Sequence, residues 1–230
     1  MSNPVLVPEL VRIPAATFVM GKERSRDDER PAHRVRIATF RAAVSPVTNA
    51  EYARFVAATG HEPAPFLDDE RFASDDQPVV GTSWFDAMDY CAWLREATGT
   101  SFRLPTEAER EFAALGGLES ADWPWGAASH PLSATIASAD RPHPPTAGCA
   151  NGYGLRCMAE NVHEWCSDWY GADYYTVSPT DAPAGPASGK RRASRGGSWR
   201  HKEKFTRIAA RSSIPPGFRY SDYGFRVYSD

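Results

Sequence analysis

The sequence has little net charge, few cysteines and no long apolar run. Its formal net charge is −3 over 230 residues, which is too small to favour a partner such as nucleic acid or an acidic membrane surface. No stretch approaches the roughly 18 apolar residues of a membrane-spanning helix, and the first residues lack the pattern of a signal peptide. The four cysteines favour a reducing, cytoplasmic setting, although a bridge between two of them stays open.

Turn-forming and aromatic residues are abundant instead. The chain contains 17 glycines, 19 prolines and 12% aromatic residues. Glycine and proline favour turns over long helices, and aromatic side chains are large enough to fill a core or to line a cleft. A chain of this length buries roughly 70% of its unfolded surface. It therefore needs neither a disulfide nor a metal merely to fold.

Two segments near the N-terminus have the pattern of strands. The apolar residues between Val11 and Met20 predict a strand that ends at Gly21. Residues 33–40 alternate between apolar and charged side chains, which is typical of a half-buried strand. Both segments are therefore expected to lie in sheets.

Three helices are predicted from capping boxes, in which a Ser or Thr is followed three residues later by Asp or Glu. These helices follow Thr48, Ser83 and Thr106, and each ends at a glycine. Beyond Ala121, short aromatic runs are separated by Gly, Pro, Ser and Asp, which predicts irregular loops and short strands. A helix-rich first half and a loop-rich second half indicate an α+β domain rather than repeated βαβ units.

Several short runs, in a fixed order, resemble the formylglycine-generating enzyme family, also called the sulfatase-modifying factor family. The runs are 18–21, 46–49, 78–84, 103–109, 123–126, 151–155, 158–165, 195–199, 209–211 and 224–227. The resemblance covers residues 10–228 and implies one domain over residues 1–230. It also implies a C-type-lectin-like fold with little regular secondary structure and a surface cleft.

The resemblance places a calcium site in the run that begins at Asn161. Amide, carboxylate and carbonyl oxygens are the ligands that Ca²⁺ prefers. The family therefore implies Asn161 and Glu164 as ligands, with Val162 through its carbonyl oxygen. An ion pair between Glu164 and an arginine is the alternative. The loop of the family's second calcium site departs from the family pattern, because Thr135 precedes Ile136 at that place, and we do not expect the second site.

The chain lacks the cysteine pair of the family's copper site. The resemblance implies that family members oxidise a substrate cysteine to formylglycine at a copper ion, which two thiolates hold just after the Gly-Gly-Ser run. Soft Cu(I) prefers such thiolates, and no cysteine follows Cys166 in this sequence. His201 stands where the first of the pair would be. We therefore do not expect formylglycine formation.

The remaining cysteines and histidines offer other ligands. Cys149 and Cys157 allow three interpretations, namely a local disulfide, a shared metal or a packed pair of thiols. His201, together with His163 or a carboxylate, is a candidate for binding iron or copper. The closely spaced His…His-x-Glu run of the iron-dependent sulfoxide synthases that carry a related domain is absent.

Two branches of the family that lack the cysteine pair suggest two functions. One branch oxidises a peptide-derived precursor in siderophore maturation, which predicts here an oxidoreductase that acts on a peptide or small molecule, with His201 as the catalytic candidate. The predicted cleft contains Ser198, Trp199, Arg200, His201, Arg211, Phe218, Tyr220 and Tyr223.

The other branch, the variable proteins of diversity-generating retroelements, uses the fold as a noncatalytic binding module. That reading predicts a surface over residues 199–223 for a protein partner, since Tyr and Ser are common in adaptable contact surfaces. A structural subunit without catalysis is the third possibility.

Overall fold

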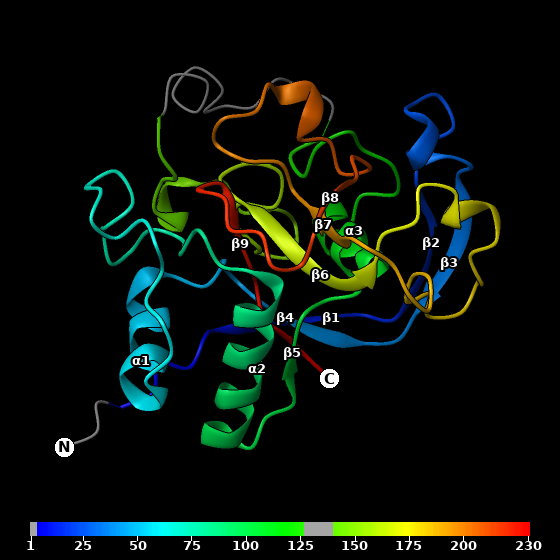
Figure 1. The fold of residues 1–230 in the computed structure, drawn as a ribbon. Coiled ribbons are helices and arrows are strands. Elements are labelled where there is room, and N and C mark those ends of the chain that lie inside the picture. Colours follow the sequence, from blue (N-terminus) through cyan, green and yellow to red (C-terminus); the bar gives the residue numbers. More distant parts are fainter. Residues whose placement is uncertain (1–3, 127–139) are drawn as a thin grey trace.

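The computed structural model describes residues 4–126 and 140–230, and they form an α+β fold (Figure 1). The α-helices are α1 (Asn49–Thr59), α2 (Trp84–Thr98) and α3 (Glu107–Leu115). The strands are β1 (Leu10–Ile13), β2 (Ala16–Met20), β3 (His33–Ile37), β4 (Phe40–Ala43), β5 (Phe102–Arg103), β6 (His163–Trp169), β7 (Arg192–Arg195), β8 (Ser212–Ile214), β9 (Tyr223–Gly224) and β10 (Tyr228–Ser229). Short 3₁₀ turns lie at Asp27–Glu29, Pro145–Ala147, Tyr174–Thr176 and Glu203–Phe205.

The three helices begin and end where the sequence predicts. The side chain of each cap, which is Thr48, Ser83 or Thr106, accepts a hydrogen bond from the third residue of its helix, and that residue's carboxylate accepts one from the cap's N–H. Each helix ends at a glycine in the left-handed region, which glycine adopts without steric cost. The capping boxes are therefore confirmed.

The two predicted N-terminal strands are each divided. Pro14 lies between β1 and β2, and proline has no N–H to donate to a neighbouring strand. The chain changes sheets at this point, because β1 pairs with β4 whereas β2 pairs with β3. The strand predicted over residues 33–40 likewise ends at Ile37, and Phe40 begins β4 in the other sheet.

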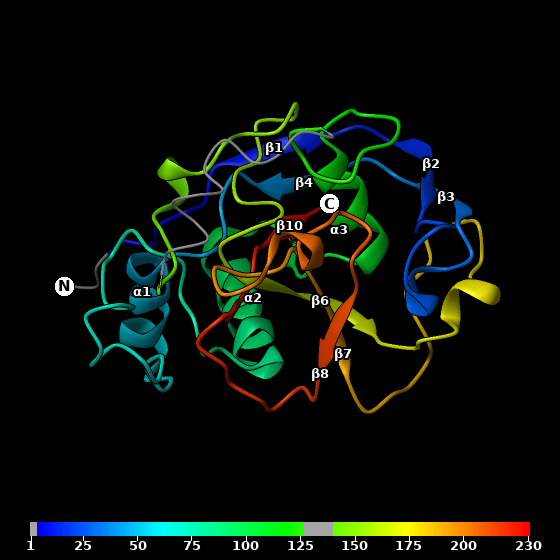
Figure 2. The same ribbon diagram turned by 90° about the horizontal axis from the view of Figure 1, so that it is seen from above.

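The strands form three sheets, with the orders β1-β4-β10-β5, β2-β3 and β8-β7-β6-β9. Figure 1 shows α1 and α2 on one side of β6 and the β2–β3 hairpin on the other side. Helix α3 contacts both β6 and β7, and Figure 2 shows it beside them from above. The third sheet therefore occupies the middle of the molecule.

Side chains alternate between the two faces of this central sheet. Glu164 of β6 and Arg195 of β7 are paired residues, and both form ion pairs with residues of α3. Their neighbours His163 and Ser194 instead contact Tyr223 of β9. One face of the sheet thus carries buried charges, and the other carries aromatic rings and His163.

After α3, the described residues form only short strands, turns and irregular segments, as the sequence predicts. None of the described helices has the length and apolar character needed to cross a bilayer.

Candidate functional site

Two histidines and an aspartate meet at the start of β6. His163 is the first residue of β6, His201 lies in the turn that follows the Gly-Gly-Ser run, and Asp222 directly precedes β9. One potential ligand atom of each residue lies within 4.8 Å of those of the other two. The parallel pairing of β6 with β9 brings Asp222 here, because the His163 N–H donates to the Asp222 carbonyl oxygen over 2.8 Å.

The Gly-Gly-Ser run brings His201 into this position. Gly196 and Gly197 have φ angles of +100° and +66°, which other residues rarely adopt. A Cβ on Gly196 would also lie 2.8 Å from a buried guanidinium nitrogen. The turn continues as the His201 N–H donates to the Ser198 carbonyl oxygen (2.9 Å), while the Ser198 hydroxyl donates to Asp222 (3.1 Å).

Aromatic contacts fix the orientation of both imidazole rings. The His163 ring stacks on Tyr223 with 4.7 Å between the ring centroids, and it meets the His201 ring edge-on at 4.9 Å. The Tyr223 hydroxyl is in turn hydrogen-bonded to Ser194 and Ser212. His163 is therefore held by the sheet itself rather than by a flexible loop.

Burial keeps both imidazoles neutral. It lowers the pKa of His163 to about 3, with smaller contributions from His201 and Arg110, and it also lowers the pKa of His201. The Nδ1 atoms of both rings are buried and find no hydrogen-bond partner in the part of the chain that the structure describes. Neutral imidazole is the form that binds metals, and two histidines with one carboxylate are typical of non-haem iron sites. These residues therefore fit a divalent transition metal.

Most of the predicted cleft residues gather around this group. A guanidinium nitrogen of Arg200 lies 3.8 Å from a carboxylate oxygen of Asp222, and the Trp199 indole N–H donates to the carbonyl oxygen of Ser221. Phe218 and Tyr220 lie further out and are 48% and 43% exposed. His163 and Asp222 are thus surrounded by Ser198, Trp199, Arg200, His201 and Tyr223. The ring centroid of Tyr220 lies 6.1 Å from that of Tyr223.

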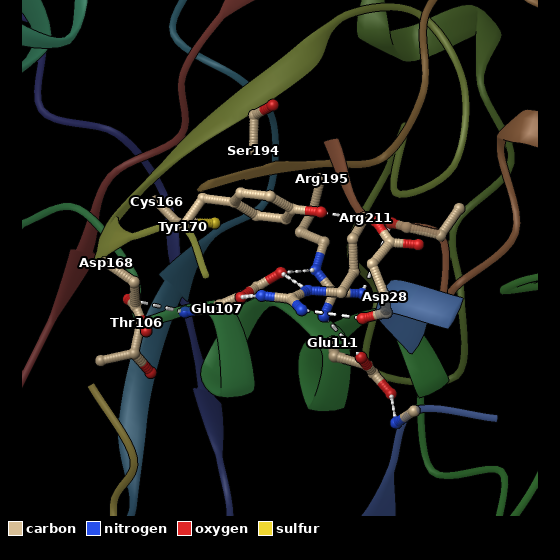
Figure 3. Close-up of polar contacts among 12 residues, drawn as sticks. Asp28, Thr106, Glu107, Glu111, Cys166, Asp168, Tyr170, Ser194, Arg195 and Arg211 are labelled. Carbon is tan, nitrogen blue, oxygen red and sulfur yellow. Dashed lines mark hydrogen bonds and ion pairs between the residues drawn. The ribbon is translucent and has the colours of Figure 1, made fainter. Parts of the chain in front are cut away.

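Arg211 lies in a different environment from the predicted cleft. Its guanidinium pairs with both carboxylate oxygens of Glu107 on α3, at 2.8 Å each, and it is 2% exposed (Figure 3). Arg195 pairs with the same carboxylate and with Glu111. Arg211 therefore stabilises the interface between α3 and the sheet, and it contacts Glu107 and Asp28 rather than the other residues of the predicted cleft.

Glu164 adopts the ion-pair alternative that the sequence left open. Its carboxylate accepts hydrogen bonds from Arg110 at 2.7 Å and from Arg226 at 2.8 Å, and all three side chains are fully buried. Burial alone would raise the pKa of Glu164, but the two guanidinium groups outweigh it and lower that pKa. Both carboxylate oxygens are thus engaged by arginine.

Asn161 is also engaged within the protein. Its amide oxygen accepts from the His143 N–H (2.9 Å), and its amide nitrogen donates to the His143 carbonyl oxygen (2.8 Å). Val162 is buried beside it. Calcium binding at residues 161–164 stays a prediction, which these contacts disfavour. The interpretation of Thr135 and Ile136 falls outside the described residues.

The four cysteines are free thiols. Cys157 is fully buried, whereas Cys149 is exposed, so the two form neither a disulfide nor a packed pair.

Asp222 is the functional candidate that the sequence analysis did not name. An aspartate before a Gly-Phe-Arg run carries no local metal signature, and only the β6–β9 pairing brings it to the two histidines.

The full chain, residues 1–230, matches the family model of the sulfatase-modifying factor enzyme 1-like domain. The formylglycine-generating enzyme of Streptomyces coelicolor is 34% identical over 96% of this chain and 88% of that protein. Hercynine oxygenase of Mycolicibacterium smegmatis is 28% identical over 97% of the chain and 60% of that protein. The serine/threonine-protein kinase pkn1 of Chlamydia caviae is 35% identical over 96% of the chain, which spans 38% of that relative's length.

Two solved structures share the fold over nearly the whole chain. PvdO from Pseudomonas aeruginosa has a TM-score of 0.84 with 26% identity and covers 100% of both chains. Variable protein 1 of Treponema denticola has a TM-score of 0.82 with 25% identity over 96% of this chain and 94% of that one. The predicted α+β, C-type-lectin-like fold is confirmed.

Proposed function

Because the chain belongs to the sulfatase-modifying factor family, we propose that it is an oxidative enzyme with a transition metal at His163, His201 and Asp222. Its substrate is a peptide or a small molecule, and molecular oxygen is the oxidant. The observation that carries the proposal is the meeting of two neutral imidazoles, one buried and one half-buried, and a buried carboxylate within 4.8 Å. The similarity of this chain to hercynine oxygenase supports it.

The ligand set favours iron or copper bound by nitrogen and oxygen over copper bound by thiolates. The three residues offer imidazole nitrogens and a carboxylate oxygen, and the structure places no cysteine among them. Iron(II) or copper(II) binds such ligands and would supply redox chemistry with oxygen. Formylglycine formation at a thiolate-bound copper is therefore not proposed for this chain.

The residues of the chain have distinct roles in this proposal. His163 and His201 hold the metal through neutral nitrogens, and Asp222 supplies the negative charge. Ser198 orients the Asp222 carboxylate through its hydroxyl hydrogen bond. Arg200, whose side chain is half exposed beside Asp222, offers a cation to an anionic group of the substrate.

Metal analysis of the purified protein tests this function. We expect about one equivalent of iron or copper in the wild type, its loss in His201→Ala, and oxygen uptake that depends on the same histidine. His61→Ala is the matched control, since His61 follows α1 and contacts Tyr52 of α1 and Asp86 of α2. Calcium as the sole bound metal, or a full complement of iron or copper in His201→Ala, would overturn the proposal.

A binding module without catalysis is the second candidate function. It is favoured by Phe218 and Tyr220, two exposed aromatic side chains with ring centroids 6.0 Å apart, and by the fold shared with a variable protein. This candidate gains support if a peptide ligand binds equally well to the wild type and to His201→Ala while Tyr220→Ala abolishes binding.

A further inference from the structure

A second group of potential metal ligands lies on the segments that precede β6. His143, Cys157 and Glu160 each place one potential ligand atom within 4.8 Å of those of the other two. We propose that these residues form a zinc site that is separate from the site of His163, His201 and Asp222. The inference stands independently of the oxidative function, because it uses none of the same side chains.

Two buried polar atoms of this group have no hydrogen-bond partner among residues 4–126 and 140–230. Glu160 is 4% exposed, and its Oε2 accepts from the backbone N–H of Ala159 (3.1 Å), whereas its Oε1 has no hydrogen-bond partner. The Nε2 of His143 is likewise buried and unpartnered. Leaving a buried polar atom unpaired is costly, so a ligand between these atoms would remove a real penalty.

The His143 ring has the arrangement that metal-binding histidines usually show. Its Nδ1 lies 3.1 Å from the Pro144 carbonyl oxygen, so Nδ1 carries the proton and donates to that oxygen. The lone pair is thereby left on Nε2. A histidine that binds a metal through one nitrogen commonly donates its other N–H to a backbone carbonyl in this way.

The backbone leaves space between the thiol and the carboxylate. A Cβ on Gly148 would lie 2.7 Å from the Cys157 Sγ and 3.2 Å from the Glu160 Oε1. The φ angle of Gly148 is −77°, which any residue adopts, so the glycine is required here for space rather than for conformation. That space is bounded by the two atoms that would bind the ion.

The donor set distinguishes the metal. A thiolate, an imidazole and a carboxylate are the usual ligands of Zn²⁺, and a fourth position is commonly filled by water. Calcium binds oxygen ligands alone, so the cysteine argues against it. Without an ion, burial raises the pKa of Glu160 to about 7 and that of Cys157 well above its ordinary value.

Zinc at this position would join the segment of His143 to the segment of Cys157 and Glu160, which leads into His163. Asn161 already links them through both of its hydrogen bonds to the His143 backbone, and its amide also donates to the Cys157 Sγ at 3.5 Å. The carbonyl oxygen of Asn161 accepts from the Trp199 N–H. The metal would therefore stabilise the segment that carries the chain into His163, because an ion that binds only the native state raises its stability.

Cobalt(II) titration of the metal-free, full-length protein tests this inference. Cobalt replaces zinc, and a bound thiolate gives a near-ultraviolet charge-transfer band that nitrogen and oxygen ligands do not give. We expect the band in the wild type, in Cys149→Ser and in His201→Ala, and its loss in Cys157→Ser. Cys149 is the matched control, since it is an exposed cysteine eight residues away. Zinc should displace the cobalt and abolish the band.

A second variant and a second measurement cover the case in which Cys157→Ser fails to fold. Glu160→Gln keeps the size of the side chain, and we expect it to bind zinc at least about tenfold more weakly while circular dichroism shows a folded protein. Zinc should raise the melting temperature of the wild type but not that of Glu160→Gln. Absence of the band in the wild type, its loss in Cys149→Ser, or unchanged zinc affinity in folded Glu160→Gln would overturn the inference.

Discussion

His163 combines two roles that a single substitution can separate. Its ring packs on Tyr223, whereas its nitrogens belong to the proposed metal site. His163→Phe keeps a ring of similar size and removes both nitrogens. We expect bound iron or copper to fall to background while the free energy of unfolding changes by less than about 1.5 kcal/mol. Metal analysis with thermal unfolding checks this, and a full metal content in His163→Phe would contradict it.

Asp168, at the edge of the buried charges in Figure 3, gives a pH-dependent prediction. Burial, reinforced by the nearby Glu107, raises the pKa of Asp168 to about 7, whereas in the unfolded chain it is about 3.9. Between these values the native state binds a proton that the unfolded state lacks. This contribution to stability is therefore complete below about pH 4 and is lost as the pH rises through 7.

Asp168→Asn should remove this dependence. Its amide oxygen can still accept from the Glu107 N–H, as Asp168 does over 2.9 Å. We expect the stability of the variant relative to the wild type to rise from pH 4 to pH 8, by up to roughly 4 kcal/mol, since each pKa unit is worth about 1.4 kcal/mol. Urea unfolding at several pH values measures this. Parallel plots of the free energy of unfolding against pH for the two proteins would refute it.

At the scale of elements, α3 is held to the central sheet by charge. Glu107 pairs with both Arg195 and Arg211, and all three side chains are at least 96% buried. Glu107→Gln leaves the buried Arg211 without a carboxylate and Arg195 with only that of Glu111, so we expect a loss of about 3 to 5 kcal/mol in the free energy of unfolding. Chemical denaturation measures the loss.

An exposed ion pair supplies the control for this prediction. Arg36 and Asp181 pair on the surface, with about two thirds of each side chain exposed. Asp181→Asn should change the free energy of unfolding by less than about 1 kcal/mol. Equal losses in the two variants would show that burial does not determine the strength of the α3 contact.

The same helix shows which features a sequence can reveal. The capping box at Thr106 and Glu109 lies within four consecutive residues, so its pattern is visible without the fold. The partners of Glu107 lie 88 and 104 residues away, and nothing in the local sequence indicates them. Glu107 itself therefore reads as an ordinary first-turn acid, although it lies at the centre of the ion pairs.

At the scale of the whole molecule, the C-terminal strand β10 pairs with strands from the first half of the chain. β10 lies between β4 and β5, and the Tyr228 side chain is fully buried. Removal of residues 228–230 should lower the free energy of unfolding by at least about 3 kcal/mol, because it removes a buried aromatic ring and the pairing of two strands. Asp230→Ala, which alters only an exposed pair with Arg103, should cost less than about 1 kcal/mol.

The effect of this truncation is measured by the melting temperature and by the cooperativity of unfolding. A truncated chain that unfolds like the wild type would contradict the structural role of β10.

The fold and the site differ in how far the sequence predicts them. The ordered runs from residue 18 to residue 227 identify the family, and with it the fold, because many short motifs act together. The site depends on long-range contacts, so His163 and His201 were recognised from their places in motifs, whereas Asp222 was not. His143 is missed for the same reason, since it lies 14 positions before Cys157 and a turn comes between them.

The alternation of β6 has a consequence for how this protein could change. Glu164 fixes the strand to Arg110 and Arg226 on one face, while His163 presents its ring on the other. The proposed ligands at residues 163, 201 and 222 can therefore be substituted without altering the ion pairs of Glu164. This separation of the two faces suits the fold to redesign, because Cys, His or Asp side chains could be introduced on one face while the ion pairs on the other face stay unchanged.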